Sequence, residues 1–153
     1  MRVRTRIDHG ARAVKVSSRA EYGLRALVDL ARHYGEGYVQ SHEIAARQGL
    51  PESYLNQIMA SLRRAGLVAR KRGPAGGHTL SRPPAQITLR EAFEVLEEGA
   101  APWWCVGVED PNCAYLPGCG IRPIWMAMKA AAEGVLERLT LHDMIYGHAP
   151  GGE

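Results

Sequence analysis

The chain has 153 residues, 46% of them apolar and 23% charged, with a formal net charge of +3. This composition is ordinary for a soluble globular protein, and the length is sufficient for one compact domain with a short appendage. No apolar run approaches the roughly 18 residues of a membrane span, and the arginine-rich N-terminus lacks the apolar stretch of a secretory signal. We therefore expect a cytoplasmic protein with no membrane partner.

The N-terminal residues 1–14 show no clear period and are interpreted as a basic arm. The first helix is expected over 18–34, followed by Gly35. Ser17 or Ser18 can cap this helix, and Glu21 lies in its first turn, where the helix dipole favours a negative charge.

Two short helices are expected next. The first runs over 41–48, with Ser41 as its cap and Gly49 at its end. The second starts near Pro51 and ends near Gly66. Its inward face is predicted to consist of four apolar residues, Leu55, Ile58, Met59 and Leu62. A link of about three residues between two short helices indicates a helix-turn-helix.

A basic hairpin is predicted to follow. Residues 67–70 and 78–80 are typical of short strands, and a Gly- and Pro-rich turn joins them. From Ser53 to Arg90 there is no Asp or Glu. Seven cations lie inside this interval: Arg63, Arg64, Arg70, Lys71, Arg72, Arg82 and Arg90. A cation-only segment is suited to a phosphate backbone, with a solvated charged face as the alternative.

The last third of the chain combines a capping signal, a loop and a long helix. Thr88 with Glu91 three residues later predicts a helix through Leu96. All three cysteines lie in the Gly- and Pro-rich stretch 99–120. The final helix carries an apolar stripe with a period close to 3.5, made by Ile121, Trp125, Met128, Ala132, Val135 and Leu139. Such a stripe favours a partner chain, with packing on the first helix as the alternative.

The outward face of the third helix is the expected reading surface for DNA. Asn and Gln can pair with adenine in the major groove, Ser can contact bases or phosphates, and cations neutralise phosphates. Tyr54 either stacks on a sugar or covers the core. The candidate DNA-binding residues are Ser53, Tyr54, Asn56, Gln57, Arg63, Arg64, Lys71 and Arg72.

Several motifs in this order resemble one family. They are Ser18–Leu27 (SRAEYGLRAL), Pro51–Gln57 (PESYLNQ), Leu62–Val68 (LRRAGLV) and Arg72–Leu80 (RGPAGGHTL). The likeness extends to Ile87–Leu89, Ile124-Trp125 and Thr140-Leu141, and it covers nearly everything after Val14. By these motifs the chain resembles the Rrf-two (IscR/NsrR-like) family of winged helix-turn-helix transcriptional regulators.

The resemblance implies a homodimer, often a repressor, with the long late helix at the dimer interface. It also implies an iron–sulfur cluster ligated by Cys105, Cys113 and Cys119. The gaps are unequal, with seven residues between the first two cysteines and five between the last two, and Arg122 replaces the histidine that completes the set in some members. In other relatives a carboxylate from the partner's first helix is the fourth ligand, and Glu21 matches that position.

The cysteines also favour metal or redox chemistry without the resemblance. Three is an odd number, and a reducing cytosol disfavours structural disulfides. Thiolates are the usual ligands of iron–sulfur clusters, whereas zinc modules usually show close Cys-x-x-Cys pairs that are absent here. A cluster, with 2Fe–2S favoured over 4Fe–4S, is the preferred interpretation. Direct thiol redox sensing and zinc are the alternatives.

Catalysis is not expected. The histidines are scattered, and the Gly73–Gly77 turn lacks the lysine of a phosphate-binding loop. We expect a mainly α protein, a winged helix-turn-helix with a β-hairpin wing and a long C-terminal dimerisation helix. It should bind an operator duplex under cluster control, with no small-molecule substrate, and a winged-helix adaptor is the rival. The expected divisions are arm 1–14, DNA-binding domain 15–98, cluster loop 99–120, dimerisation helix 121–140 and tail 141–153.

Overall fold

The computed structural model describes residues 16–97 and 113–147. The expected basic arm and Cys105 lie outside these residues. In chain order the elements are α1 (Ser18–Arg32), α2 (Ser41–Gln48), α3 (Glu52–Arg64), β1 (Val68–Lys71), β2 (Gly77–Leu80), the 3-10 helix η1 (Pro84–Gln86), α4 (Leu89–Leu96), α5 (Arg122–Arg138) and α6 (Leu141–Tyr146). The described residues are mostly helical, with one two-stranded antiparallel sheet, and this confirms the expected fold class.

Local signals determine most of the helix ends. The Ser17 side chain caps α1 by accepting a hydrogen bond from the Ala20 N–H at 3.1 Å. Gly49 ends α2 in the left-handed conformation, and Thr88 with Glu91 forms the predicted capping box of α4. The cap of α2 differs from expectation, because Gln40 holds that position and Ser41 is already helical. The first helix also ends two residues early, at Arg32.

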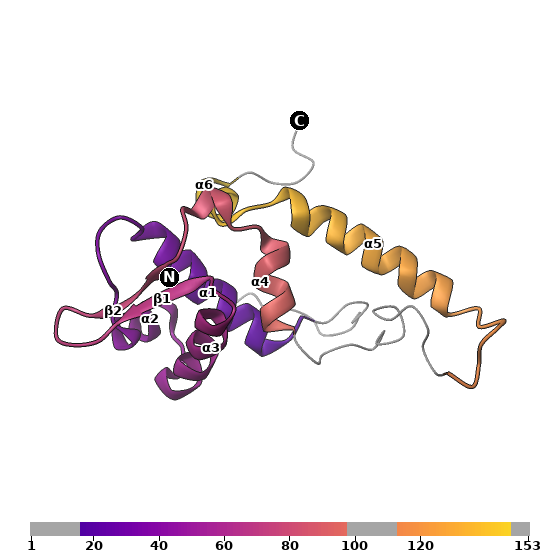
Figure 1. The fold of residues 1–153 in the computed structure, drawn as a ribbon, viewed down its shortest axis with the longest axis horizontal. Coiled ribbons are helices and arrows are strands. Elements are labelled where there is room, and N and C mark those ends of the chain that lie inside the picture. The colour runs from indigo at the N-terminus through magenta and orange to yellow at the C-terminus, as the bar shows by residue number, and fades with distance from the viewer. Residues whose placement is uncertain (1–15, 98–112, 148–153) are drawn as a thin grey trace, which may run out of the picture.

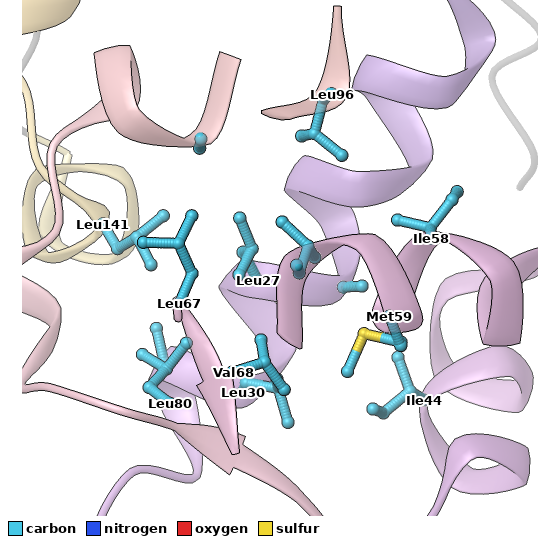
Figure 2. Close-up of a cluster of buried hydrophobic side chains, with 14 of the residues drawn as sticks. Leu27, Leu30, Ile44, Ile58, Met59, Leu67, Val68, Leu80, Leu96 and Leu141 are labelled. Atoms are coloured by element: carbon cyan, nitrogen blue, oxygen red, sulfur yellow. The ribbon is translucent and has the colours of Figure 1, made fainter. Parts of the chain in front are cut away.

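Apolar side chains from α1, α2, α3, α4, α6 and the hairpin converge on one core (Figure 2). Leu27 of α1 and Ile58 of α3 are fully buried there, as is Leu141 of α6. The predicted inward face of α3 is confirmed, since Leu55, Ile58, Met59 and Leu62 are all buried.

Residues 141–146, which the sequence analysis assigned to a tail, form helix α6. Thr140 accepts a hydrogen bond from the Asp143 N–H, and the Asp143 carboxylate accepts one from the Thr140 N–H at 2.8 Å. Leu141 is buried, and its N–H donates to the Ile87 carbonyl at 3.0 Å. The burial of Leu141, with Ile145 packed beside it, therefore holds α6 against the shared core.

The elements α1 to β2 form one lobe of the molecule. Helix α5 extends away from this lobe, and the hairpin and α2 lie at its opposite end (Figure 1). Helix α5 contacts α4, and Arg90 of α4 forms an ion pair with Glu137 of α5. No residue of α5 is buried. No helix in the described ranges is long and apolar enough to cross a membrane.

Candidate nucleic-acid interface

Helix α3 presents the face that the sequence analysis assigned to DNA. Ser53, Asn56 and Gln57 are exposed, whereas Tyr54 is half-buried. The ring of Tyr54 packs edge-on against Tyr22 of α1, with the centroids 5.7 Å apart. This contact favours the interpretation of Tyr54 as a residue that covers the core. The three exposed polar side chains remain available to a groove.

The position of α2 beside α1 depends on a buried carboxylate. Asp29 is 2% exposed and accepts hydrogen bonds from Arg47 Nε and Nη2 at 2.9 and 2.7 Å and from Gln48 Nε2 at 3.1 Å. Burial alone would raise the pKa of Asp29, but the hydrogen bonds from Arg47 and Gln48 outweigh it and hold the pKa below its ordinary value. The two helices are thus joined by an ion pair whose buried carboxylate accepts three hydrogen bonds.

The hairpin brings the cations of the wing to one end of the lobe. Val68 pairs with Leu80, and Arg70 pairs with His78. Lys71 ends β1, and Arg72 begins the turn. Both side chains are exposed, and the Lys71 ammonium lies 5.8 Å from the centre of the Tyr38 ring. The wing therefore carries positive charge without a neighbouring carboxylate in its own strands.

The cations at the end of α3 are placed differently. Arg63 and Arg64 are exposed in the last turn. Arg64 Nη2 donates to the Ser61 hydroxyl at 3.1 Å, and Arg19 of α1 donates to the same oxygen at 2.7 Å. Sequence reasoning missed Arg19, because only the fold brings α1 beside the end of α3.

The cysteine loop leads directly into α5. Cys113 and Cys119 are half-buried free thiols, and the loop that carries them ends at Arg122, where α5 begins. Cys105 lies outside the described residues. Within 16–97 and 113–147 no three His, Cys, Asp or Glu side chains gather at metal-binding distance.

Glu21, the fourth candidate ligand, lies on the open side of α1. Its carboxylate accepts a hydrogen bond from Arg25 at 2.7 Å, and its side chain is 54% exposed. It lines a groove together with Val16, Leu24, Arg25, Val28, Arg32, Gln48, Phe93 and Met144. The structure does not join Glu21 to Cys113 and Cys119 within one chain.

A helix-turn-helix, a basic hairpin and a long helix beyond them define a winged-helix protein of the DNA-binding class. The profile of the Rrf2 family, described as an iron-dependent transcriptional regulator, matches residues 16–147. The chain therefore belongs to the Rrf2 family of transcriptional regulators. The relatives carry the names of transcriptional regulators and not of enzymes, which confirms the expectation that catalysis is not its role.

Two groups of named regulators are similar to the chain. CymR of Bacillus subtilis is 34% identical over 86% of this chain and 89% of its own, and IscR of Serratia proteamaculans is 31% identical over 86% and 79%. Among solved structures, T. potens IscR superimposes with a TM-score of 0.73 at 39% identity, covering 92% of each chain. CymR of B. subtilis, titled the global cysteine regulator, gives 0.70 at 32%, covering 90% of this chain and 99% of its own.

Proposed function

We propose that the chain represses transcription by binding an operator as a homodimer, in the cytoplasm, where bacterial DNA lies. Ser53, Asn56 and Gln57 on α3 read base edges in the major groove. The cations Arg63, Arg64, Lys71 and Arg72 bind phosphates, and Tyr54 supports α3 from the core side. The exposure of this polar face beside a carboxylate-free wing carries the proposal.

DNA binding is tested by titrating a duplex of about 30 base pairs, long enough for two half-sites, selected by the protein from a random pool. Binding should weaken steeply with salt, because each neutralised phosphate contributes about −0.9 to the slope of log K against log salt. Arg72→Ala should reduce the slope by about one such step. Salt-independent or absent binding would favour the winged-helix adaptor instead.

The dimer is proposed to form through α5. Four apolar side chains on or beside this helix are exposed: Ile121 (56%), Ile124 (57%), Met126 (46%) and Val135 (37%). At about 100° per residue, Ile121, Ile124 and Val135 lie on one face of the helix, whereas Met126 lies on the opposite side. An exposed apolar face of this kind on one long helix is typical of a surface that a second chain covers. Ile124→Lys should produce monomers in sedimentation velocity. Tyr38→Ser, which removes an exposed aromatic ring beside the wing, should leave the dimer intact.

We further propose that operator binding responds to an iron–sulfur cluster held by Cys105, Cys113 and Cys119, with Glu21 of the partner subunit as the fourth ligand. The donor set fits such a group, because Cys113 and Cys119 are free thiols with partial access to solvent. Glu21 fits it too, since its half-exposed carboxylate is paired with an exposed arginine, Arg25. A bound cluster would supply redox and ligand-loss chemistry.

A change at the cysteines would affect DNA binding through helix α5. Cys119 lies three positions before Arg122, where α5 begins, and α5 is proposed to join the two subunits. A change in the bonding of the thiolates would shift the loop against α5. This shift would alter the distance between the two α3 helices, and two half-sites can be engaged together only at the right distance.

The cluster is tested by anaerobic reconstitution, followed by absorption spectra and assays of iron and acid-labile sulfide. Equal iron and sulfide should be found, with an iron count that separates 2Fe–2S from 4Fe–4S. Glu21→Gln should change the spectrum or stability of the cluster, whereas Glu36→Gln, at another exposed carboxylate, should not. A colourless protein after reconstitution would contradict the cluster while leaving the DNA-binding proposal in place.

Direct thiol sensing is the second candidate. One structurally similar protein is titled the oxidised form of Staphylococcus aureus CymR, at a TM-score of 0.67 and 28% identity. If the thiols themselves are the sensor, peroxide should change operator affinity in iron-free protein, and substitution of a single cysteine by Ala should abolish that response. Stoichiometric zinc after metal-free purification and zinc addition would instead favour a zinc site.

A further inference from the structure

The base of the wing is joined to the segment that precedes α2. Val39 and His78 exchange both backbone hydrogen bonds, each 2.8 Å long, although 39 positions separate them in the chain. Gln40 Nε2 donates to the Gly76 carbonyl at 2.7 Å. Strand β2 therefore begins against the residues that lead into the helix-turn-helix.

The side chain of His78 extends this junction into α2. It is 5% exposed, and its Nε2 atom lies 2.8 Å from the hydroxyl oxygen of Ser41, the first residue of α2. The Nδ1 atom is buried without a partner among the described residues. Directly across the hairpin, His78 pairs with Arg70, and the next pair is Lys71 with Gly77. The junction is thus beside the cations of the wing.

We propose that His78 is a positioning residue for DNA binding: through its hydrogen bond to Ser41 it holds the wing at a set angle to α2 and α3. The proposal rests on the proposed DNA-binding function. If it is correct, the wing cations Lys71 and Arg72 reach phosphates while α3 lies in the groove only when this contact is intact.

The hairpin is too small to hold this angle by itself. Each strand has four residues, and an isolated two-stranded hairpin is at best marginally stable in water. Its direction therefore depends on what holds its base. The backbone pair with Val39 and the Gln40–Gly76 hydrogen bond anchor the hairpin to the segment before α2, and the His78–Ser41 contact adds an anchor on α2 itself.

The charges around His78 favour a neutral imidazole. Burial lowers the pKa of His78, and the guanidinium groups of Arg70 on β1 and Arg63 on α3 lower it further. Ser41, which faces it from α2, is uncharged. A neutral ring can share one hydrogen with Ser41, and no buried N–H is then forced to remain without an acceptor at Nδ1.

The close approach of Gly77 to the backbone of Val39 supports the proposal that this junction positions the wing. Gly77 has φ of +138°, and a Cβ atom there would lie 2.5 Å from the Val39 carbonyl oxygen. Because that neighbour is backbone, a side chain at position 77 would separate β2 from the segment before α2. Gly77→Ala is expected to weaken DNA binding in the same way as loss of the His78 contact.

The test uses the full chain and the selected duplex described above, titrated by fluorescence anisotropy at several KCl concentrations. His78→Leu and Ser41→Ala remove the contact from either side. His78→Gln places a terminal amide where Nε2 lies, and Thr79→Val is the matched control in the same strand. Circular dichroism and sedimentation establish that each variant is a folded dimer.

We expect His78→Leu and Ser41→Ala each to weaken binding about tenfold, and to reduce the salt slope by close to two phosphate steps of about 0.9 each. The double variant should be no weaker than either single variant, because both remove one contact. His78→Gln should restore most of the affinity and the full slope. Thr79→Val should bind the duplex with the same affinity and salt slope as the protein without substitutions.

Three results would overturn the proposal. One is an unchanged affinity and slope in Ser41→Ala, which is the milder substitution and serves if His78→Leu does not fold. The second is a glutamine variant that binds as weakly as the leucine variant, which would mean that His78 only fills space. The third is the absence of salt-dependent DNA binding in the protein without substitutions. That result would remove the proposed DNA-binding function together with this inference.

Discussion

The contact between Asp29 and Arg47 gives the sharpest prediction about stability. Asp29→Asn keeps the shape of the side chain and removes its charge. The carboxylate is 2% exposed and accepts three hydrogen bonds from Arg47 and Gln48. Breaking a buried ion pair costs about 3–5 kcal/mol when the remaining charge stays buried.

Here the remaining charge can return to water, because the Arg47 side chain is 40% exposed. The asparagine oxygen can also still accept one hydrogen bond. The expected loss in the free energy of unfolding is therefore smaller, about 2–3 kcal/mol at pH 7. Glu94→Gln is the control, since its pair with Arg90 is exposed on both sides and should contribute less than about 0.5 kcal/mol.

The assay is urea denaturation at fixed protein concentration, because the apparent stability of the proposed dimer would depend on concentration. The pKa of Asp29 is lowered in the folded chain, so its contribution is present above the unfolded value of about 3.9 and is lost as the pH falls through the folded value. The difference between the two proteins should be constant from pH 7 to about 5 and shrink below about 4. A difference under about 0.5 kcal/mol at pH 7, or one that persists unchanged at low pH, would refute the reasoning.

Three further predictions follow from buried or reading-face residues. Leu27→Ala should lower the free energy of unfolding by about 2–5 kcal/mol in the same assay, because Leu27 is fully buried among several elements; a loss under about 1 kcal/mol would contradict its core position. As the pH falls below about 6.5, the unfolded chain gains a proton at His78 before the folded chain does, so stability should fall more steeply than in His78→Gln. Parallel pH curves would show that His78 does not titrate differently on folding. Asn56→Ala should relax the preferred base at one position of each half-site in a selection from random duplexes, and an unchanged consensus would remove Asn56 from the reading face.

Local sequence determined the helix-turn-helix and the wing. Gly49 can adopt the left-handed conformation that ends α2, and the Gly- and Pro-rich turn after Arg72 can reverse the chain. The spacing of Leu55, Ile58, Met59 and Leu62 likewise predicted the buried face of α3. Such signals act within a few residues, so they can be recognised without knowing what lies nearby in space.

The junctions between elements were decided by the tertiary structure alone. A buried aspartate or histidine looks like any polar residue in the sequence, because its partner lies far along the chain: Asp29 meets Arg47, and His78 meets the half-buried Ser41. The cap of α2 moved to Gln40, and the Ser41 hydroxyl instead lies against His78. Helix α6 has a local cap at Thr140, but it is the burial of Leu141 in the shared core that makes so short a helix stable. Contacts between residues that lie far apart in the chain depend on the whole fold, and no local sequence pattern predicts them.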